Sequence, residues 1–162
     1  MAVAGGPAQG TDVTEDRQVQ ELTALESLRL LASVSFGRVV FTHHALPAIR
    51  PVSHLLVDRK IIIIASLGSA ISIPADSQGQ PGTDGTIVAY EADSIDPDTH
   101  LGWSVVVIGQ AGLVLDQAEV AGYRAVLRPW IAGTMDDVIA IRTELVTGHR
   151  LVAATAPYLA MG

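Results

Sequence analysis

The sequence predicts a mainly β (α+β) fold, built as a mostly antiparallel β-barrel with two or more short helices. Segments rich in Val, Ile and Thr recur along the chain and are separated by turn-forming residues. They do not alternate with helices, as the strands of a doubly wound parallel sheet would. Because 49% of the residues are hydrophobic but only 4% are aromatic, the core must be mostly aliphatic. A chain of 162 residues fits one domain.

Composition and charge exclude several classes of protein. Seventeen acidic residues face ten basic ones, and the net charge of −7 lacks the positive surface that nucleic-acid binding requires. The absence of cysteine excludes disulfides and thiolate sites. No apolar run approaches the ~20 residues of a membrane helix. Residues 1–17 lack a signal-peptide pattern and predict a flexible tail before a single domain over residues 18–162. We therefore expect a cytoplasmic protein that binds neither nucleic acid nor membrane.

The first predicted helix begins at Thr23. The segment Thr23-Ala24-Leu25-Glu26 has the spacing of a capping box, in which the Thr hydroxyl accepts a backbone N–H and the Glu side chain reaches back. Three leucines then fall on one face, and we expect the helix to run to about Ala32. These leucines are Leu25, Leu28 and Leu31.

Three strands are predicted after this helix, and the third is the most apolar. The strands cover residues 38–42, 48–57 and 61–66, with a turn over 43–46 and a tight connection at Asp58–Arg59 or Arg59–Lys60. The third strand opens with four isoleucines, Ile61 to Ile64. A sheet with one wet face would alternate apolar and polar residues, so both faces of this strand should be covered.

The second half of the chain contains a loop, two further strands, a helix and a last strand. The loop spans residues 75–85, the next strand covers 86–92, and another covers 104–115. Gly109 and Gly112 interrupt that strand, which indicates a bulge or a barrel bend. A cap at Asp116 begins an amphipathic helix, which is marked by Val120, Tyr123, Leu127 and Trp130 and ends near Pro129. The last predicted strand covers residues 137–145.

Six short motifs occur in a characteristic order: Gly37-Arg38-Val39, Arg50-Pro51-Val52, Tyr90-Glu91-Ala92-Asp93, Gly102-Trp103-Ser104-Val105, Gly109-Gln110-Ala111 and Val146-Thr147-Gly148-His149-Arg150. In this order the chain, over roughly residues 19–152, resembles the pyridoxamine 5′-phosphate oxidase-like, FMN-binding split-barrel family. The resemblance implies an FMN-dependent oxidoreductase of unknown substrate. It also implies a homodimer with two equivalent flavin sites in the groove between two split barrels.

The resemblance also implies which residues bind the cofactor. One strand contacts the phosphate and runs beneath the flavin ring, and it carries Arg50, Pro51, Val52 and Ser53. The end of the next strand meets the phosphate through Ala65 and Ser66. Ser104 lies near the ring, and Trp103 precedes it. Arg50 could instead pair with a surface carboxylate, Ser66 could serve only the turn, and Trp103 could anchor the dimer interface.

At one position the chain departs from the family pattern. Ser69 and Ala70 stand where the family's oxidases carry a basic pair that grips the phosphate. A phosphomonoester carries roughly −1.5 to −2 charges at neutral pH. Each lost charged hydrogen bond is worth about 1.5–3 kcal/mol, so Arg50 would hold FMN less tightly alone. Two alternatives follow, a deazaflavin-dependent reductase and a non-catalytic dimeric module that binds a cofactor or heme.

The histidines predict no metal site. His43 and His44 are adjacent, and on a strand they would point to opposite faces. His54 should share a strand face with Arg50 and Val52, which makes it a candidate proton donor or ligand contact. Chemistry, where present, would belong to the cofactor, and the protein would supply binding and electrostatics.

Overall fold

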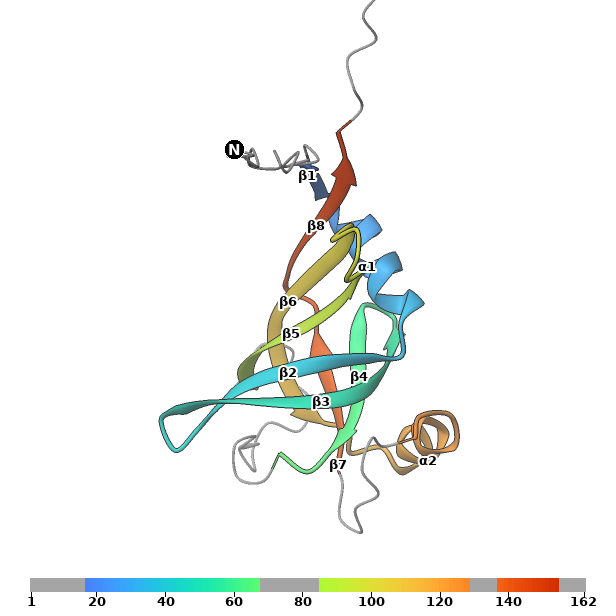
Figure 1. Cartoon of the computed structure of the whole chain (residues 1–162). Helices are drawn as coiled ribbons and strands as arrows, with labels where there is room; N and C mark the ends of the chain where they lie inside the picture. The colour runs from blue at the N-terminus through green and yellow to red at the C-terminus, as the bar shows by residue number, and fades with distance from the viewer. Residues whose placement is uncertain (1–16, 68–84, 129–136, 155–162) are drawn as a thin grey trace, which may run out of the picture.

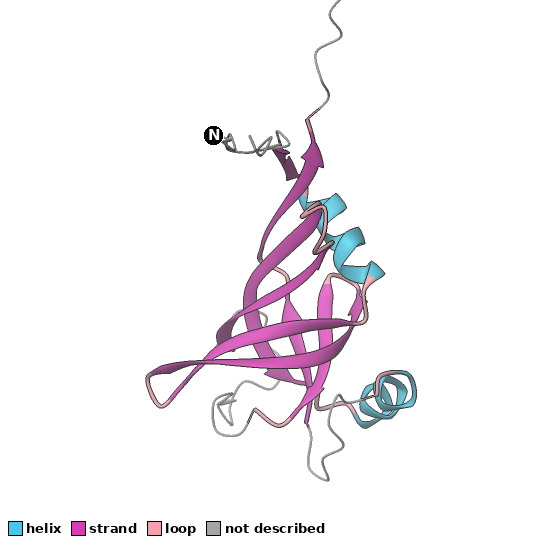
Figure 2. Cartoon of the chain, in the orientation of Figure 1, coloured by secondary structure: helices cyan, strands magenta, loops and turns pink. Residues whose placement is uncertain are grey.

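The computed structural model describes residues 17–67, 85–128 and 137–154 and confirms the mainly β class, with strands and two helices (Figure 2). All strand pairs are antiparallel. The elements in chain order are β1 (Arg17–Leu22), α1 (Ala24–Ser33), β2 (Phe36–His43), β3 (Leu46–Val57), β4 (Lys60–Ala65), β5 (Thr86–Ile95), β6 (Gly102–Leu113), α2 (Gln117–Val126), β7 (Asp137–Arg142) and β8 (Leu145–Ala153).

A closed barrel forms because β6 pairs with three strands. The sheet order is β1-β8-β6-β5-β2-β3-β4-β7, and a further pairing of β7 with β6 closes six of these strands into a barrel, with β8 and β1 extending from it (Figure 1). The first part of β6, from Gly102 to Ile108, pairs with β8, and Ala111–Leu113 pairs with β7. The change of neighbour falls at Gly109, where a Cβ atom would overlap the Arg142 carbonyl oxygen. The glycine at which a bulge or bend was predicted therefore lies where β6 changes its neighbour and the barrel closes, while the ladder with β5 continues through it.

The four isoleucines of β4 are covered on both faces, as predicted. Ile61 and Ile63 lie in the main core inside the barrel. Ile62 and Ile64 lie in a second cluster with Leu127 and Val138, against which Val120 and Tyr123 of α2 pack. The helix α2 thus covers the outside of β4 and β7, and this explains why β4 has no polar face.

Both predicted helix caps are present. Thr23 and Glu26 form the capping box, with Glu26 N–H donating to the Thr23 hydroxyl and the Thr23 N–H donating to Glu26. Asp116 accepts from the Glu119 N–H at the start of α2. The predicted apolar face of α1 is partly wrong: Leu28 and Leu31 are buried, but Leu25 is 59% exposed. The helix α2 ends at Val126, a few residues before the predicted end, and residues 129–136 lie outside the described part of the chain.

Two predictions about strands were wrong. The strand β1 was not predicted, because its residues Arg17–Leu22 are mostly polar and exposed, and β8 is the one strand with which they pair. The single last strand predicted over 137–145 is two strands, β7 and β8, which reverse direction at residues 143–144. The turn is held by long-range contacts, since Thr143 N–H donates to the Arg59 carbonyl and Glu144 N–H to the Ile108 carbonyl.

The two hairpin turns on either side of β3 are short and tight. The first is centred on His44 and Ala45, with φ of 49° and 62°, and the second on Asp58 and Arg59, with φ of 47° and 59°. Pairs of residues with positive φ match the right-handed twist of the flanking strands. The structure therefore selects Asp58–Arg59 over Arg59–Lys60 as the connection. No helix in the described part of the chain has the length and apolar character needed to cross a membrane.

Candidate functional site

The strand β3 changes its surroundings at the predicted phosphate-binding segment. Arg50 and Pro51 are exposed, whereas Val52, Ser53 and His54 are all buried. From Leu46 to Ser53 the strand pairs with β2, and its ladder with β4 begins only at His54. Pro51 thus lies on an edge where its missing N–H costs no ladder bond, as expected for proline in a sheet. The first two site residues lie at the surface and the next two in the wall of the barrel.

The end of β4 extends beyond its ladder with β3. His54 and Ile63 form the last pair of the β3–β4 ladder. Because the strands are antiparallel, the chain from His54 back to Arg50 and the chain from Ile63 on to Ser66 leave that pair in the same direction. Ala65 is half-buried and Ser66 is exposed. Both predicted groups therefore leave the β3–β4 ladder at the same end, Arg50–Ser53 paired with β2 and Ala65 with β7, while Ser69 and Ala70 lie outside the described residues.

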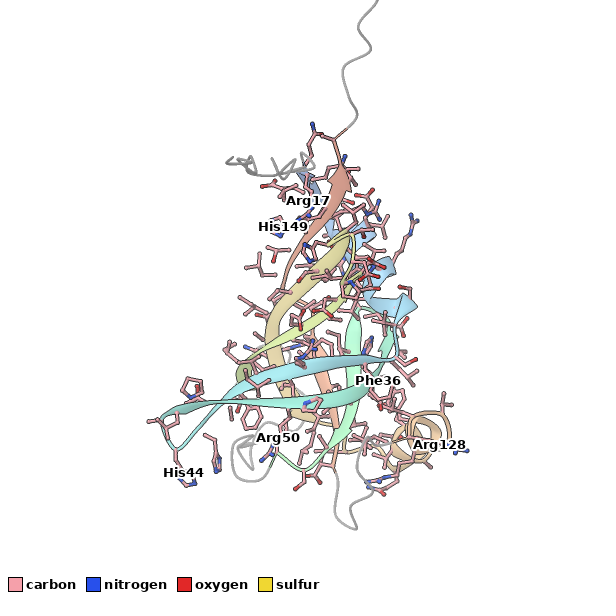
Figure 3. All side chains as sticks on the ribbon, in the orientation of Figure 1. Arg17, Phe36, His44, Arg50, Arg128 and His149 are labelled. Atoms are coloured by element: carbon pink, nitrogen blue, oxygen red, sulfur yellow. The ribbon has the colours of Figure 1, made fainter. Side chains whose placement is uncertain are left out.

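Trp103 and Ser104 occupy opposite faces of β6. Trp103 is 9% exposed and belongs to the main core, so its side chain faces the barrel interior. Ser104 lies on the outer face, in register with Asp93 of β5 and His149 of β8. The strands β5 and β2 separate it from β3, and Figure 3 shows Arg50 and His149 well apart. In one chain, Ser104 is thus not part of the group at Arg50.

A surface cavity of about 400 Å³ opens next to Pro51, between the end of α1, β2 and β5. Its lining includes Val34, Phe36, Arg38, Pro51 and Asp93. Phe36 is 49% exposed. A cavity of this volume is in the range that small-molecule ligands occupy.

The charged side chains at this cavity form a network around Arg38. One guanidinium nitrogen, Nη1, lies 2.9 Å from Glu91 Oε2 and 3.8 Å from Asp93 Oδ2. The hydrogen bond and charge of Glu91, with the charge of Asp93, raise the pKa of Arg38. The sequence analysis gave these residues no role, although they belong to its motifs. Their alternation could have indicated one, because the polar residues Glu91 and Asp93 alternate with buried residues along an apolar strand.

His54 shares a strand face with Arg50 and Val52, as predicted, because the β2–β3 register is unbroken. Unlike Arg50 it is buried, and its ring bonds the Leu31 carbonyl through Nε2 at 2.9 Å and the Tyr90 hydroxyl through Nδ1 at 2.7 Å. Since a carbonyl only accepts, Nε2 carries the proton and Tyr90 donates to Nδ1. Burial lowers the pKa of His54, partly opposed by the bond to Leu31, and burial raises the pKa of Tyr90. His54 therefore joins α1 to the barrel, and both of its ring nitrogens are already bonded within the protein.

The predicted separation of His43 from His44 was also wrong. The two rings lie edge to face with centroids 4.0 Å apart, because His44 sits in the left-handed turn and not on the strand. Strand alternation therefore does not separate them. Within the described residues, no group of three or more His, Asp or Glu side chains could hold a metal ion.

Comparison with known proteins extends these observations. The family model for pyridoxamine 5′-phosphate oxidase matches residues 23–157. The uncharacterized protein Rv0080 of Mycobacterium tuberculosis is 51% identical over 137 residues, which cover 85% of this chain and 88% of that protein.

Two solved structures are also similar. One is a Corynebacterium glutamicum protein provisionally assigned as a pyridoxamine 5′-phosphate oxidase, with 28% identity and a TM-score of 0.65 over 85% of this chain and all of that one. The other is an FAD-binding protein of Mycobacterium smegmatis, with 29% identity and a TM-score of 0.59 over 83% of this chain and 98% of that one. With its barrel, its six motifs and a family match over most of its length, the chain belongs to the pyridoxamine 5′-phosphate oxidase family.

Proposed function

We propose that this chain binds a flavin nucleotide and works as an FMN-dependent oxidoreductase on a small-molecule substrate. The observation that carries the proposal is the exposed pair Arg50 and Pro51, on the edge of β3 where its ladder with β4 has ended. Its family, and an FAD-binding relative at 29% identity, support a flavin over an unrelated ligand.

Arg50 is the cation best placed to meet the flavin phosphate. Segment 68–84, which follows β4, contains no Lys or Arg in its sequence. Lys60 and Arg59 lie at the other end of the β3–β4 hairpin. Arg50 would therefore supply the charged hydrogen bonds and Ser66 a neutral one. When bound, the flavin would accept or donate a hydride, and the chain's own residues would hold and orient it.

We further propose that a second copy of the chain completes the site. An apolar row crosses the outer face of five adjacent strands, because Ile49 pairs with Val40, Val40 with Ala89, Ala89 with Ile108, and Ile108 with Leu145. Three of these side chains are strongly exposed: Ile49 at 62%, Ile108 at 39% and Leu145 at 54%. Contiguous exposed apolar surface of this kind marks interaction sites. Since Ser104 and Arg50 are far apart in one chain, Ser104 would approach a bound flavin from the partner.

The flavin proposal is tested by the absorption spectrum of the purified protein and by titration of ligand-free protein with FMN, FAD, a deazaflavin and heme. We expect flavin binding, with FMN preferred. Arg50→Ala should weaken it about tenfold to a hundredfold, the ratio that one lost charged hydrogen bond gives. Lys60→Ala removes a distant positive charge and should change nothing.

The outcomes separate the alternatives. Tight binding of FAD in place of FMN would keep the flavin and reject the FMN assignment. Binding of deazaflavin or heme alone would replace the proposal, and binding of none of the four would overturn it. Bleaching of the bound flavin by NADH or NADPH under anaerobic conditions would support the oxidoreductase activity.

The dimer is tested by light scattering on a sizing column. Ile108→Lys places a charge in the middle of the apolar row and should produce a monomer. Leu115→Lys changes a side chain that is 58% exposed but lies outside the row, and it should leave the mass unchanged. A monomeric wild-type chain would refute this part of the proposal without touching flavin binding.

A further inference from the structure

We propose that the cavity beside Arg38 binds small organic cations that carry a flat apolar group. The proposal concerns a ligand other than the flavin nucleotide and does not depend on flavin binding. It rests on three observations: the net charge of the network at this cavity, the apolar side chains of its wall, and the pairing of Arg38 with Glu91.

The network carries a net negative charge. Glu91 and Asp93 both approach the same nitrogen of Arg38, at 2.9 Å and 3.8 Å, so two carboxylates share one guanidinium. Glu91 takes the shorter contact. Asp93 lines the cavity and makes the longer contact, so its charge is less completely neutralised and is available to a ligand.

The wall next to this carboxylate is apolar. Phe36, Pro51 and Val34 all line the cavity, and nearly half of the Phe36 surface is accessible. Aromatic faces attract cations as well as flat apolar groups. The planar apolar body of such a ligand would therefore contact Phe36 and Pro51, and its positive end would contact Asp93.

An anionic ligand fits this cavity poorly, although an arginine lines it. Arg38 already holds a hydrogen-bonded carboxylate, and an incoming anion would have to displace Glu91 while meeting the charge of Asp93. Like charges brought together in this way oppose binding. The flavin phosphate is thus expected at Arg50, and the cation at Asp93.

The experiment compares three molecules of nearly equal shape on the full-length protein: benzamidinium, benzamide and benzoate. Dissociation constants are measured by NMR titration at neutral pH and low ionic strength. A ligand of this size reaches roughly millimolar affinity. We expect benzamidinium to bind about fivefold more tightly than benzamide, as an exposed charge pair allows, and benzoate to bind most weakly.

Two variants locate the effect. Asp93→Asn keeps the shape of the side chain and should abolish the preference for benzamidinium over benzamide. Asp98→Asn removes a carboxylate from an exposed turn outside the cavity and should keep that preference. Phe36→Leu should weaken benzamidinium and benzamide alike.

Benzoate binding as tightly as benzamidinium, or no benzamidinium binding at millimolar concentration, would overturn the proposal. So would a preference that survives in Asp93→Asn. Thermal melting of each variant confirms that the fold is intact. Because the titrations use protein without flavin, a failure here leaves the flavin proposal standing, and failure of flavin binding leaves this test valid.

Discussion

Replacing Gly109 by alanine should destabilise the barrel strongly, because this residue lies where β6 exchanges β8 for β7 as its neighbour. The added Cβ would overlap the Arg142 carbonyl oxygen and lie 2.9 Å from the carbonyl carbon, whereas ordinary contact begins at 3.4 Å. The two backbones must therefore separate considerably. The β6–β7 ladder that closes the barrel has only three residue pairs, Ala111 to Leu113, and it lies immediately beside the clash.

The magnitude follows from these contacts. Overpacking of a tight site costs about 1–3 kcal/mol. The separation should also break about two backbone hydrogen bonds, at about 1 kcal/mol each; the bond from Glu144 N–H to the Ile108 carbonyl is the nearest. We expect Gly109→Ala to lower the free energy of unfolding by about 3–5 kcal/mol.

Urea unfolding followed by circular dichroism measures this change, at one fixed protein concentration because subunit association would also affect stability. Gly112→Ala is the matched control in the same strand, since no atom lies within 4 Å of the position that its new Cβ would take. It should change the free energy of unfolding by less than about 1 kcal/mol. A Gly109→Ala protein within about 1 kcal/mol of wild type would refute the account of barrel closure.

Three further predictions concern stability. Because burial lowers the pKa of His54, the unfolded chain binds a proton at this residue more readily than the folded chain. The free energy of unfolding should therefore be highest above about pH 6.5 and fall below that pH by at most about 1.4 kcal/mol per pH unit. Urea unfolding of wild type and His54→Gln across this pH range tests the prediction. Gly37→Ala would place a Cβ 2.5 Å from the Tyr90 hydroxyl and should lower the melting temperature well below that of Gly122→Ala, whose site is open. Thr23→Ala removes the cap of α1 and should cost about 1 kcal/mol in urea unfolding, and an unchanged midpoint would contradict it.

Local patterns were reliable where the chemistry lies within a few residues. In the caps at Thr23 and Asp116, each side chain bonds the backbone N–H three residues later, and both caps are present as predicted. The four isoleucines of β4 required two covered faces, and the barrel core and α2 cover them. Gly109 predicted a special position in β6, and there the strand exchanges β8 for β7 as its neighbour. The identity of the segment that contacts β6 there was not predictable, because Arg142 is distant in sequence.

The candidate site was predicted only in part. Arg50 and Pro51 lie at an exposed edge, while strand alternation put His54 on the face of Arg50 correctly but did not predict that it is buried. That rule assumes one wet face along the whole strand, but β3 leaves the surface at Val52. The Arg38 network was missed for a related reason: its partners come from different strands, β2 and β5, and only the register between them brings the charges together.

Residue type and spacing within single segments were enough to establish the class of the fold, its helix caps, the doubly covered strand and the family motifs. The order of the strands, the partners of His54, the distance between Ser104 and Arg50 and the charge at the cavity all depended on the folded chain. Backbone pairing fixes which distant side chains become neighbours, and no local pattern contains that information. A polar edge strand such as β1 accordingly acquires its structure only from the strand beside it.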